Sequence, residues 1–334
     1  GKRVPNLHHL DGLYPLFYTK EPGSLAEPLY LDVMTALAEA FSRGERATLP
    51  RTIGGRYGLS SKEFTPQCVQ AIFNELAFTN PRPFFTVGIY DDVTHLSLPL
   101  PERHFPSNAG LEALFYGLGS DGTVSATKNA IKIVGSSTPM FVQGYFVYDS
   151  KKAGSLTVSH MRVGPHPINS AYLIDQADFV ACHQWQFIEK YAMVERLKPG
   201  GIFLINNPYS ADDLWHRLPQ EVQAGLSQRQ ARVYCINAAK IARECQLGAH
   251  INTVMQMAFF HLSQILPGDA AVEKLRSAIE KSYGSKGEEL VARNWKALEA
   301  TLTALESVAL AAVNPESPQR PPWYPTPRRT SLKR

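Results

Sequence analysis

The sequence predicts an α/β protein, in which a small α/β domain is followed by an open, mostly parallel α/β sheet domain with a helical C-terminal part. Three observations lead to this fold class. Helical and strand patterns alternate over residues 24–89, short apolar strands separated by helices recur over 111–236, and helical periodicity prevails from there to 313. The chain has 334 residues, 44% hydrophobic and 19% charged, which favours two globular domains over a disordered chain.

The first domain is expected over residues 19–97, after an unmatched N-terminal segment, 1–18. Its first helix is predicted to begin at Ser24, which stands at capping-box spacing from Glu27, and to stop at Gly44.

A second helix is predicted where Thr65 can serve as N-cap and Pro66 as the first helical residue. A strand follows at 84–89, and the proline-rich segment 98–110 is interpreted as a linker. The expected buried face of the second helix consists of Val69, Ile72, Phe73 and Leu76.

The second domain is expected over residues 111–313. Its apolar runs and helical periods occur in an order typical of an open sheet covered by helices. The predicted elements are a strand at 111–116, a helix from 123, strands at 140–148, 156–162 and 178–183, a helix at 185–197, strands at 201–206 and 232–236, and helices at 252–266, 269–283 and 287–313.

The C-terminal segment, 314–334, is interpreted as a basic, proline-rich disordered tail, because frequent prolines prevent a helix or a central strand. It holds five basic residues and one acidic residue, which accounts for the whole net charge of +4. The remaining chain is balanced in charge, so we expect no nucleic-acid partner.

Other classes of protein are disfavoured on composition. No apolar run approaches the roughly 18 residues of a membrane span, so no membrane partner is expected and the protein is predicted to be cytoplasmic. The cysteines are four in number and widely spaced, which favours neither a disulfide framework nor an iron–sulfur cluster.

The strongest local motif is the glycine loop, residues 117–122, which has the pattern G-x-G-x-x-G between a predicted strand and a predicted helix. Such a loop lets backbone N–H groups approach a phosphate at a helix N-terminus. The expected ligand-binding residues of the loop and of the helix that follows it are Gly117, Gly119, Ser120, Asp121, Gly122, Thr123, Lys128 and Asn129.

The ligand can be a dinucleotide or another phosphate-bearing molecule. Asp149, at the end of the next strand, could bond a ribose hydroxyl, as dinucleotide sites require. Ser150, Lys151 and Lys152 follow at once, and adjacent lysines are better suited to additional phosphate, so these three join the predicted site. His183 and Cys182 at a strand end are more often structural, and the residues assign no catalytic group and no metal ligand.

The chain also resembles a known family over most of its length. Many segments, in the same order, resemble the gamma-type domain of the pyruvate:ferredoxin (flavodoxin) oxidoreductase family, and upstream segments resemble the transketolase C-terminal-like domain that precedes it there. For the gamma-type domain these are YGLGSDGTV (116–124), KNAIK (128–132), GYFVYDSKKA (144–153), SHMR (159–162), ADFVACHQ (177–184) and NTVMQMAFFH (252–261). Upstream they are TKEPGSLAEPLYLDVM (19–34), RYGLSSKEFTPQ (56–67) and FTVGIYDDVTHLSLP (85–99).

The resemblance implies an enzyme that is a homodimer and converts pyruvate to acetyl-coenzyme A. Enzymes of this family use thiamine diphosphate and iron–sulfur clusters, and they pass electrons to ferredoxin or flavodoxin. The thiamine-binding and cluster-bearing domains are not in this sequence and would be its partners. For this chain the resemblance implies coenzyme A binding, with Gly117 to Thr123 near the phosphates or adenosine and Lys151 and Lys152 near charged groups. It supplies no catalytic residue and no metal ligand, so we expect no activity from the chain alone.

Two alternatives stay open. A stand-alone NAD-dependent oxidoreductase would use the glycine loop, and a non-catalytic interaction protein or inactive remnant would use the helical third for contacts. Residues 1–16 and the tail from Pro315 do not follow the family pattern, which fits either a split subunit or a gene remnant.

Overall fold

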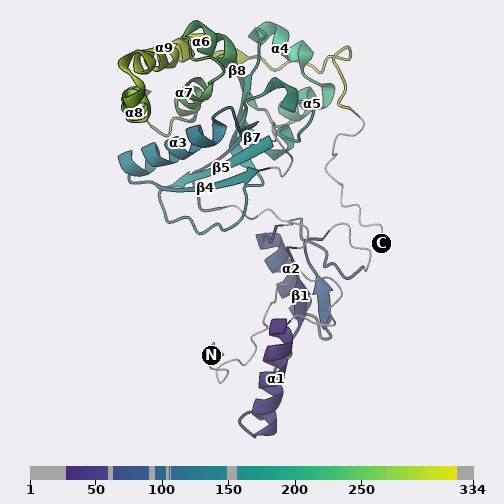
Figure 1. The fold of residues 1–334 in the computed structure, drawn as a ribbon. Coiled ribbons are helices and arrows are strands. Elements are labelled where there is room, and N and C mark those ends of the chain that lie inside the picture. Colours follow the sequence, from purple (N-terminus) through teal and green to yellow (C-terminus); the bar gives the residue numbers. More distant parts are fainter. Residues whose placement is uncertain are drawn as a thin grey trace. The chain divides into compact units, whose positions relative to one another are not determined.

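The computed structural model describes residues 28–58, 63–89, 95–102, 105, 107–148, 156–266 and 268–321. The chain divides into two compact units, Gly1–Pro106 and Ser107–Arg334, and the division falls inside the segment 98–110 (Figure 1).

In the part of the first unit that the structure describes, there are two helices and a pair of parallel strands. Its elements are α1 (Pro28–Ser42), β1 (Gly54–Arg56), α2 (Pro66–Leu76) and β2 (Phe84–Thr86), with β1 parallel to β2. A core between α2, the strand pair and the segments next to them consists of Ile53, Cys68, Ala71, Ile72, Phe85, Val87 and Leu98. The predicted cap residues Ser24 and Glu27 lie outside the described residues.

Helix α2 begins where the Thr65-Pro66 signal predicts, but its buried face differs from the predicted one. Val69 and Phe73 are 38% and 63% exposed, whereas Cys68 and Ala71 are buried with Ile72. Of the predicted face, Ile72 and Leu76 pack in or against the core of this unit, whereas Val69 and Phe73 face outward.

The second unit is built on a seven-stranded sheet of order β4-β5-β3-β6-β7-β8-β9. The pairings show that β5 and β9 run opposite to the other five strands, so the sheet is mostly parallel in direction. The strands are β3 (Leu111–Leu118), β4 (Phe141–Tyr148), β5 (Leu156–Gly164), β6 (Ala177–Cys182), β7 (Leu197–Asn206), β8 (Arg232–Ile236) and β9 (Glu306–Val308). The predicted α/β fold class is thus confirmed.

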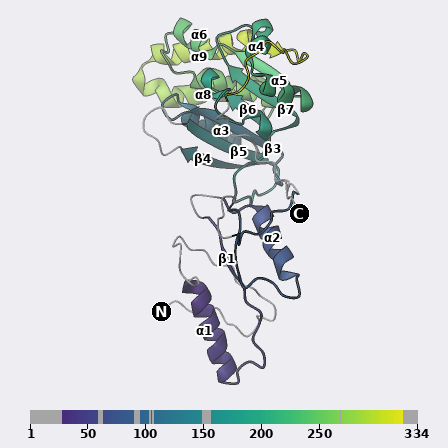
Figure 2. The same cartoon turned by 90° about the vertical axis from the view of Figure 1, so that its right-hand side faces the viewer.

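Helical layers cover both faces of the sheet (Figures 1 and 2). Along β3, Ala113 and Phe115 belong to one buried cluster, and Leu114 and Tyr116 to the other, as the period of two in a strand requires. The first cluster is completed by α3 (Thr123–Ser137), α6 (Ala238–Glu244), α7 (Asn252–Ser263), α8 (Gly268–Tyr283) and α9 (Glu288–Ala304), and the second by α4 (Ala211–Arg217) and α5 (Gln220–Gln228).

The helix predicted over 185–197 is wrong. The structure has two single 3-10 turns, Trp185–Phe187 and Val194–Arg196, and β7 already begins at Leu197. Apolar residues of this segment are buried in the second cluster, and the short turns bring them to the sheet without the length of a helix. Burial therefore prevails over helical periodicity here.

The prediction of a disordered tail from 314 is wrong for residues 314–321. These residues form a strap across α4 and α5, whose centre is the fully buried Gln223. The Nε2 of Gln223 donates to Ser317 Oγ at 2.8 Å, and its Oε1 accepts from the Asn314 backbone N–H at 2.8 Å. Arg320 forms an ion pair with Glu195. A buried amide thus stabilises a chain that its prolines keep out of regular structure; residues 322–334 lie outside the described residues.

The helix predicted over 287–313 is also shorter than expected. Helix α9 ends at Ala304, and the chain continues as β9, which pairs antiparallel with β8.

Candidate functional site

The glycine loop lies where the sequence predicts it, between the carboxyl end of β3 and the start of α3. Gly117 has no room for a side chain, because an added Cβ would lie 2.0 Å from Thr123 Oγ1. Gly122 precedes the helix with φ at +85°, a conformation that favours glycine, and it abuts Asn252 of α7. Both glycines are therefore explained by local packing and turn geometry.

Asp121 is buried at the centre of this loop, and its carboxylate accepts four hydrogen bonds. Oδ1 accepts from the backbone N–H of Thr123 at 2.9 Å and from its hydroxyl at 2.5 Å. Oδ2 accepts from the backbone N–H of Leu118 at 2.8 Å and from Gln184 Nε2 at 2.9 Å. Burial alone raises the pKa of Asp121, but the interaction with His183 and these hydrogen bonds outweigh it and hold the pKa below its ordinary value. The carboxyl group is thus ionised and fully bonded.

His183 extends this cluster to the end of β6. Its Nδ1 lies 2.7 Å from Thr123 Oγ1. Since the single hydroxyl hydrogen of Thr123 goes to Asp121, Nδ1 must carry the hydrogen of this second bond. Burial lowers the pKa of His183 to about 4, so the ring is neutral near pH 7, and its Nε2 has no partner among the described residues. Asn206, at the end of β7, donates to the His183 carbonyl at 2.9 Å. Three neighbouring strands are therefore tied together at their carboxyl ends.

A groove of about 340 Å³ runs between α3, α7 and α8. The predicted ligand residues Lys128 and Asn129 lie in it, together with Lys132 one turn further along α3. Within the described part of the chain, its lining includes no Asp or Glu, so its charge is positive. α3 also contributes Ser125, and the polar groups on the walls formed by α7 and α8 are Asn252, Thr253, Gln256, Ser282 and Tyr283.

The other predicted ligand residues have different surroundings. Gly119 and Ser120 are exposed on the outer side of the loop. Asp149, Ser150, Lys151 and Lys152 lie outside the described residues, after the last described residue of β4, Tyr148. The structure therefore brings Lys128 and Asn129 together in one groove, and it gives Asp121 and Thr123 internal partners.

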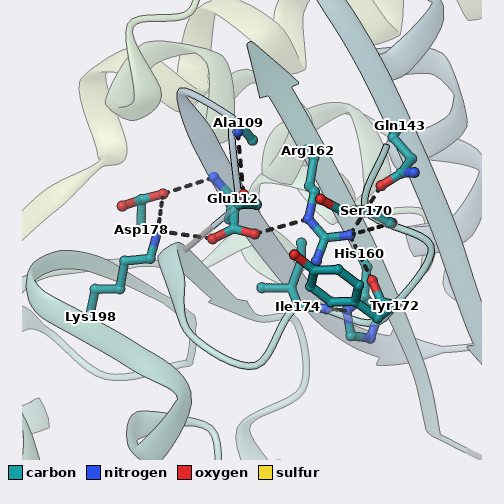
Figure 3. A network of polar contacts seen from close by, with 11 residues as sticks. Ala109, Glu112, Gln143, His160, Arg162, Ser170, Tyr172, Ile174, Asp178 and Lys198 are labelled. Atoms are coloured by element: carbon teal, nitrogen blue, oxygen red, sulfur yellow. Dashed lines mark hydrogen bonds and ion pairs between the residues drawn. The ribbon is translucent and has the colours of Figure 1, made fainter. Parts of the chain in front are cut away.

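Sequence reasoning missed a buried ionic cluster at the opposite edge of the sheet (Figure 3). Arg162 of β5 is 1% exposed; its Nε donates to Glu112 of β3 at 2.9 Å, and its Nη1 donates to Gln143 Oε1 of β4 at 3.0 Å. Nη1 also donates to the carbonyls of Ser170 and Tyr172 at 3.3 and 2.7 Å. The sequence signal that could have revealed this cluster is one charged residue in each of two apolar strands, Glu112 in β3 and Arg162 in β5.

Glu112 connects this cluster to β6 and β7. Lys198 lies 3.0 Å from Glu112 and 2.9 Å from Asp178, and Asp178 accepts a bond from the Glu112 backbone N–H at 2.8 Å. Burial would raise the pKa of Glu112, but hydrogen bonds from Arg162 and Lys198 prevail and lower it. Every residue of this cluster has a structural partner, so we assign it to the scaffold.

Two searches bear on cofactors and membranes. The described residues contain no group of three or more His, Cys, Asp or Glu that could hold a metal ion. The helices in the described part of the chain are all too short or too polar to cross a bilayer.

A mostly parallel sheet with helices on both faces, and with a cationic groove beside α3, makes the second unit an α/β domain. A family model described as pyruvate ferredoxin/flavodoxin oxidoreductase matches residues 112–304, more than half of the chain. The chain therefore belongs to the pyruvate ferredoxin/flavodoxin oxidoreductase family.

Relatives in several bacteria agree with this assignment. The chain is 72% identical over 91% of its length to a "Probable pyruvate-flavodoxin oxidoreductase" of Escherichia coli, of which it covers 26%. It is 52% identical over 89% of its length to the pyruvate-flavodoxin oxidoreductase of Trichormus variabilis and 50% identical over 88% to the pyruvate:ferredoxin oxidoreductase of Moorella thermoacetica, covering 25% of each. The chain thus spans about a quarter of the length of these curated relatives.

Solved structures with similar chains include the pyruvate oxidoreductase subunit PORC of Thermotoga maritima, with a TM-score of 0.48 and 20% identity, covering 60% of this chain and 98% of that one. A 2-oxoglutarate:ferredoxin oxidoreductase of Magnetococcus marinus, described with 2-oxoglutarate, coenzyme A and succinyl-CoA bound, gives a TM-score of 0.46 and 20% identity, covering 63% of this chain and 33% of that one.

Proposed function

We propose that this chain is the part of a pyruvate:ferredoxin (flavodoxin) oxidoreductase that binds coenzyme A and supports the other domains, without catalysing the reaction alone. The observation that carries this proposal is the 72% identity over 91% of the chain to the Escherichia coli relative, of which it spans 26%. In this proposal, residues 19–97 and 111–313 are two successive domains of the longer enzyme.

The cationic groove supports coenzyme A as the ligand. Coenzyme A carries several phosphate groups, and Lys128 and Lys132 offer mobile ammonium groups to them. Amide and hydroxyl groups on α7 and α8 can bond the polar parts of the molecule. Ser150, Lys151 and Lys152 remain further candidates for the same phosphates.

The remaining equipment of the enzyme belongs, in this proposal, to the three quarters of the relatives' length that this chain does not span. That part would hold thiamine diphosphate and the iron–sulfur clusters and would pass electrons to ferredoxin or flavodoxin. The full enzyme would be a cytoplasmic homodimer.

Calorimetric titration of the purified chain with coenzyme A tests the binding role. We expect saturable binding that weakens roughly a hundredfold in the double variant Lys128→Ala/Lys132→Ala, since the two lost charge-assisted contacts contribute roughly 1.5 kcal/mol each. Lys240→Ala removes an exposed lysine of α6 outside the groove and serves as the matched control. Equal binding by the double variant and the control would contradict the groove assignment.

A parallel assay tests the absence of independent activity. The chain, supplied with pyruvate, thiamine diphosphate and coenzyme A, should reduce no electron-accepting dye. Dye reduction that depends on coenzyme A would refute the proposal that the chemistry needs other domains.

A further inference from the structure

We infer that Asp121 is a built-in anion that closes the glycine loop to phosphate, so that a ligand meets this loop only at its exposed outer residues, Gly119 and Ser120. The inference rests on the proposed function only for the identity of that ligand. It makes Asp121 a positioning residue rather than a ligand contact.

The first step concerns the donors that a phosphate would need. In a glycine loop that binds phosphate, backbone N–H groups at the helix start point to the anion. Here the N–H group of Leu118, at the end of β3, and that of Thr123, at the start of α3, both point to Asp121, at 2.8 and 2.9 Å. The carboxylate of the protein itself therefore holds the position of the anion.

The second step concerns the capacity of this carboxylate. An ionised carboxyl group has about four lone-pair positions. The Asp121 oxygens accept four bonds, two each, the remaining pair coming from the Thr123 hydroxyl and Gln184 Nε2. Asp121 is also 8% exposed, so the group is saturated and turned away from solvent. Moving the carboxylate to admit a ligand would break these hydrogen bonds, so we expect it to keep its position when a ligand binds.

The third step concerns space and charge. The side chain of Thr123 is fully buried and lies against Gly117 so closely that no Cβ fits between them. A phosphate entering the loop would have to displace this side chain and approach the negative charge of Asp121 in a poorly solvated site, where like charges repel strongly. The partial positive charge of the α3 N-terminus is already balanced by that carboxylate.

The remaining surface of the loop defines where a ligand can touch it. Gly119 and Ser120 are exposed, and Gly122 leads directly to Asn252 at one wall of the cationic groove. Asp121 thus directs anionic groups of a ligand away from the helix start and toward Lys128 and Lys132. The loop itself keeps the shape that its internal bonds impose.

Removing the carboxylate provides the test, with inorganic phosphate as the probe. We expect Asp121→Ala to lower Tm by roughly 5–10 °C in chloride buffer, because several donors lose their acceptor. Phosphate at equal ionic strength should then occupy the vacated position and restore about half of that loss. A merely structural loss would not respond to the identity of the anion.

Two controls separate this effect from general stabilisation by phosphate. The unmodified chain and Asp212→Ala, which removes an exposed acidic residue from the first turn of α4, should gain equally little from phosphate. An equal gain in all three proteins would overturn the inference.

A second measurement applies even if Asp121→Ala does not fold. In the unmodified chain, titration with inorganic phosphate should leave the amide NMR signals of Leu118 and Thr123 unchanged. Saturable shifts of these two signals would overturn the inference. Neither experiment uses coenzyme A, so failure here and failure of the proposed coenzyme A site can be distinguished.

Discussion

The main sheet holds a buried charge at both ends of its parallel strands, and stabilises the two in different ways. We call the end at which β3, β6 and β7 finish the carboxyl edge, and the end at which they begin the amino edge. At the carboxyl edge, the described groups that donate to the Asp121 carboxylate are uncharged: two backbone N–H groups, a hydroxyl and an amide. At the amino edge, Glu112 needs the cations Arg162 and Lys198. The comparison shows that a helix start can serve as the counter-charge of a carboxylate, whereas an edge without one must recruit side chains of opposite charge.

The two edges also differ in what they leave available. The carboxyl edge lies beside the cationic groove of α3, and its loop keeps two exposed residues. At the amino edge, Arg162 and Lys198 are bonded to internal partners from β3, β4, β6 and the segment around Tyr172 (Figure 3). In the proposed function, ligand binding belongs to the first edge and structural support to the second.

The largest expected effect on stability comes from breaking the ionic cluster at the amino edge. Arg162→Ala leaves the carboxylate of Glu112 with fewer partners and frees buried carbonyls, so the free energy of unfolding should fall by about 3–5 kcal/mol. Urea unfolding followed by circular dichroism measures this loss. Arg276→Ala, which removes an exposed ion pair with Glu299, is the control and should cost less than about 1 kcal/mol. Similar losses in the two variants would contradict the scaffold role.

Acid should weaken both edges through their buried histidines. Burial lowers the pKa of His183 to about 4, and burial, with Arg196 and Arg162 nearby, lowers the pKa of His160 to about 3. The unfolded chain binds these protons below a pH of about 6.5 and the folded chain does not, so stability falls as pH decreases from there toward 4.

The loss from His183 alone should reach roughly 3 kcal/mol by pH 4. Urea unfolding across this pH range measures it, and His183→Gln should flatten the slope, whereas replacement of the exposed His216 should not. An unchanged slope in His183→Gln would contradict the neutral state of this ring.

A smaller loss of stability, in Asp121→Asn, tests whether the charge of Asp121 matters at the carboxyl edge. Asp121→Asn keeps one acceptor oxygen but turns an amide toward a donor, which should reduce the free energy of unfolding by about 2 kcal/mol. The loss should be independent of the identity of the anion, unlike that of Asp121→Ala, because the amide still fills the site. Urea unfolding in chloride and in phosphate distinguishes the two cases, and a larger gain from phosphate in the Asn variant would argue against this explanation.

The smallest effect concerns the partly exposed end of the amino-edge cluster. Lys198 is 31% exposed, so Lys198→Ala should cost only about 1 kcal/mol by urea unfolding. High salt should reduce this difference between the variant and the unmodified chain. A loss as large as that of Arg162→Ala would mean that Lys198, and not Arg162, anchors the cluster.

Local signals explain what could be predicted. The glycine loop was located because its glycines, the preceding apolar strand and the following helix are adjacent in sequence. The hydrogen-bond partners of the loop were not predictable. Gln184 reaches Asp121 from 63 residues away, and His183 reaches Thr123 from 60 residues away, only because β3 pairs with β6.

Long-range register likewise hid the other features. Glu112 and Arg162 meet because they are partners in the β3–β5 pairing, which no local pattern specifies. The strap from Asn314 was concealed by its prolines, since its order comes from Gln223 of α5 and not from its own periodicity. Lys128 and Asn129 were predicted as ligand residues because they lie one turn into the helix after the glycine loop, and both line the groove.

The path of the chain after α9 also limits the pairing of strands from other molecules with the β9 margin of the sheet. α9 packs on one face, β9 pairs with β8 over only three residues, and the strap then continues over α4 and α5 of the other face. This wrapped margin offers little backbone to a foreign strand, as short edge strands generally do. The β9 margin of the described sheet is therefore a poor template for strand addition.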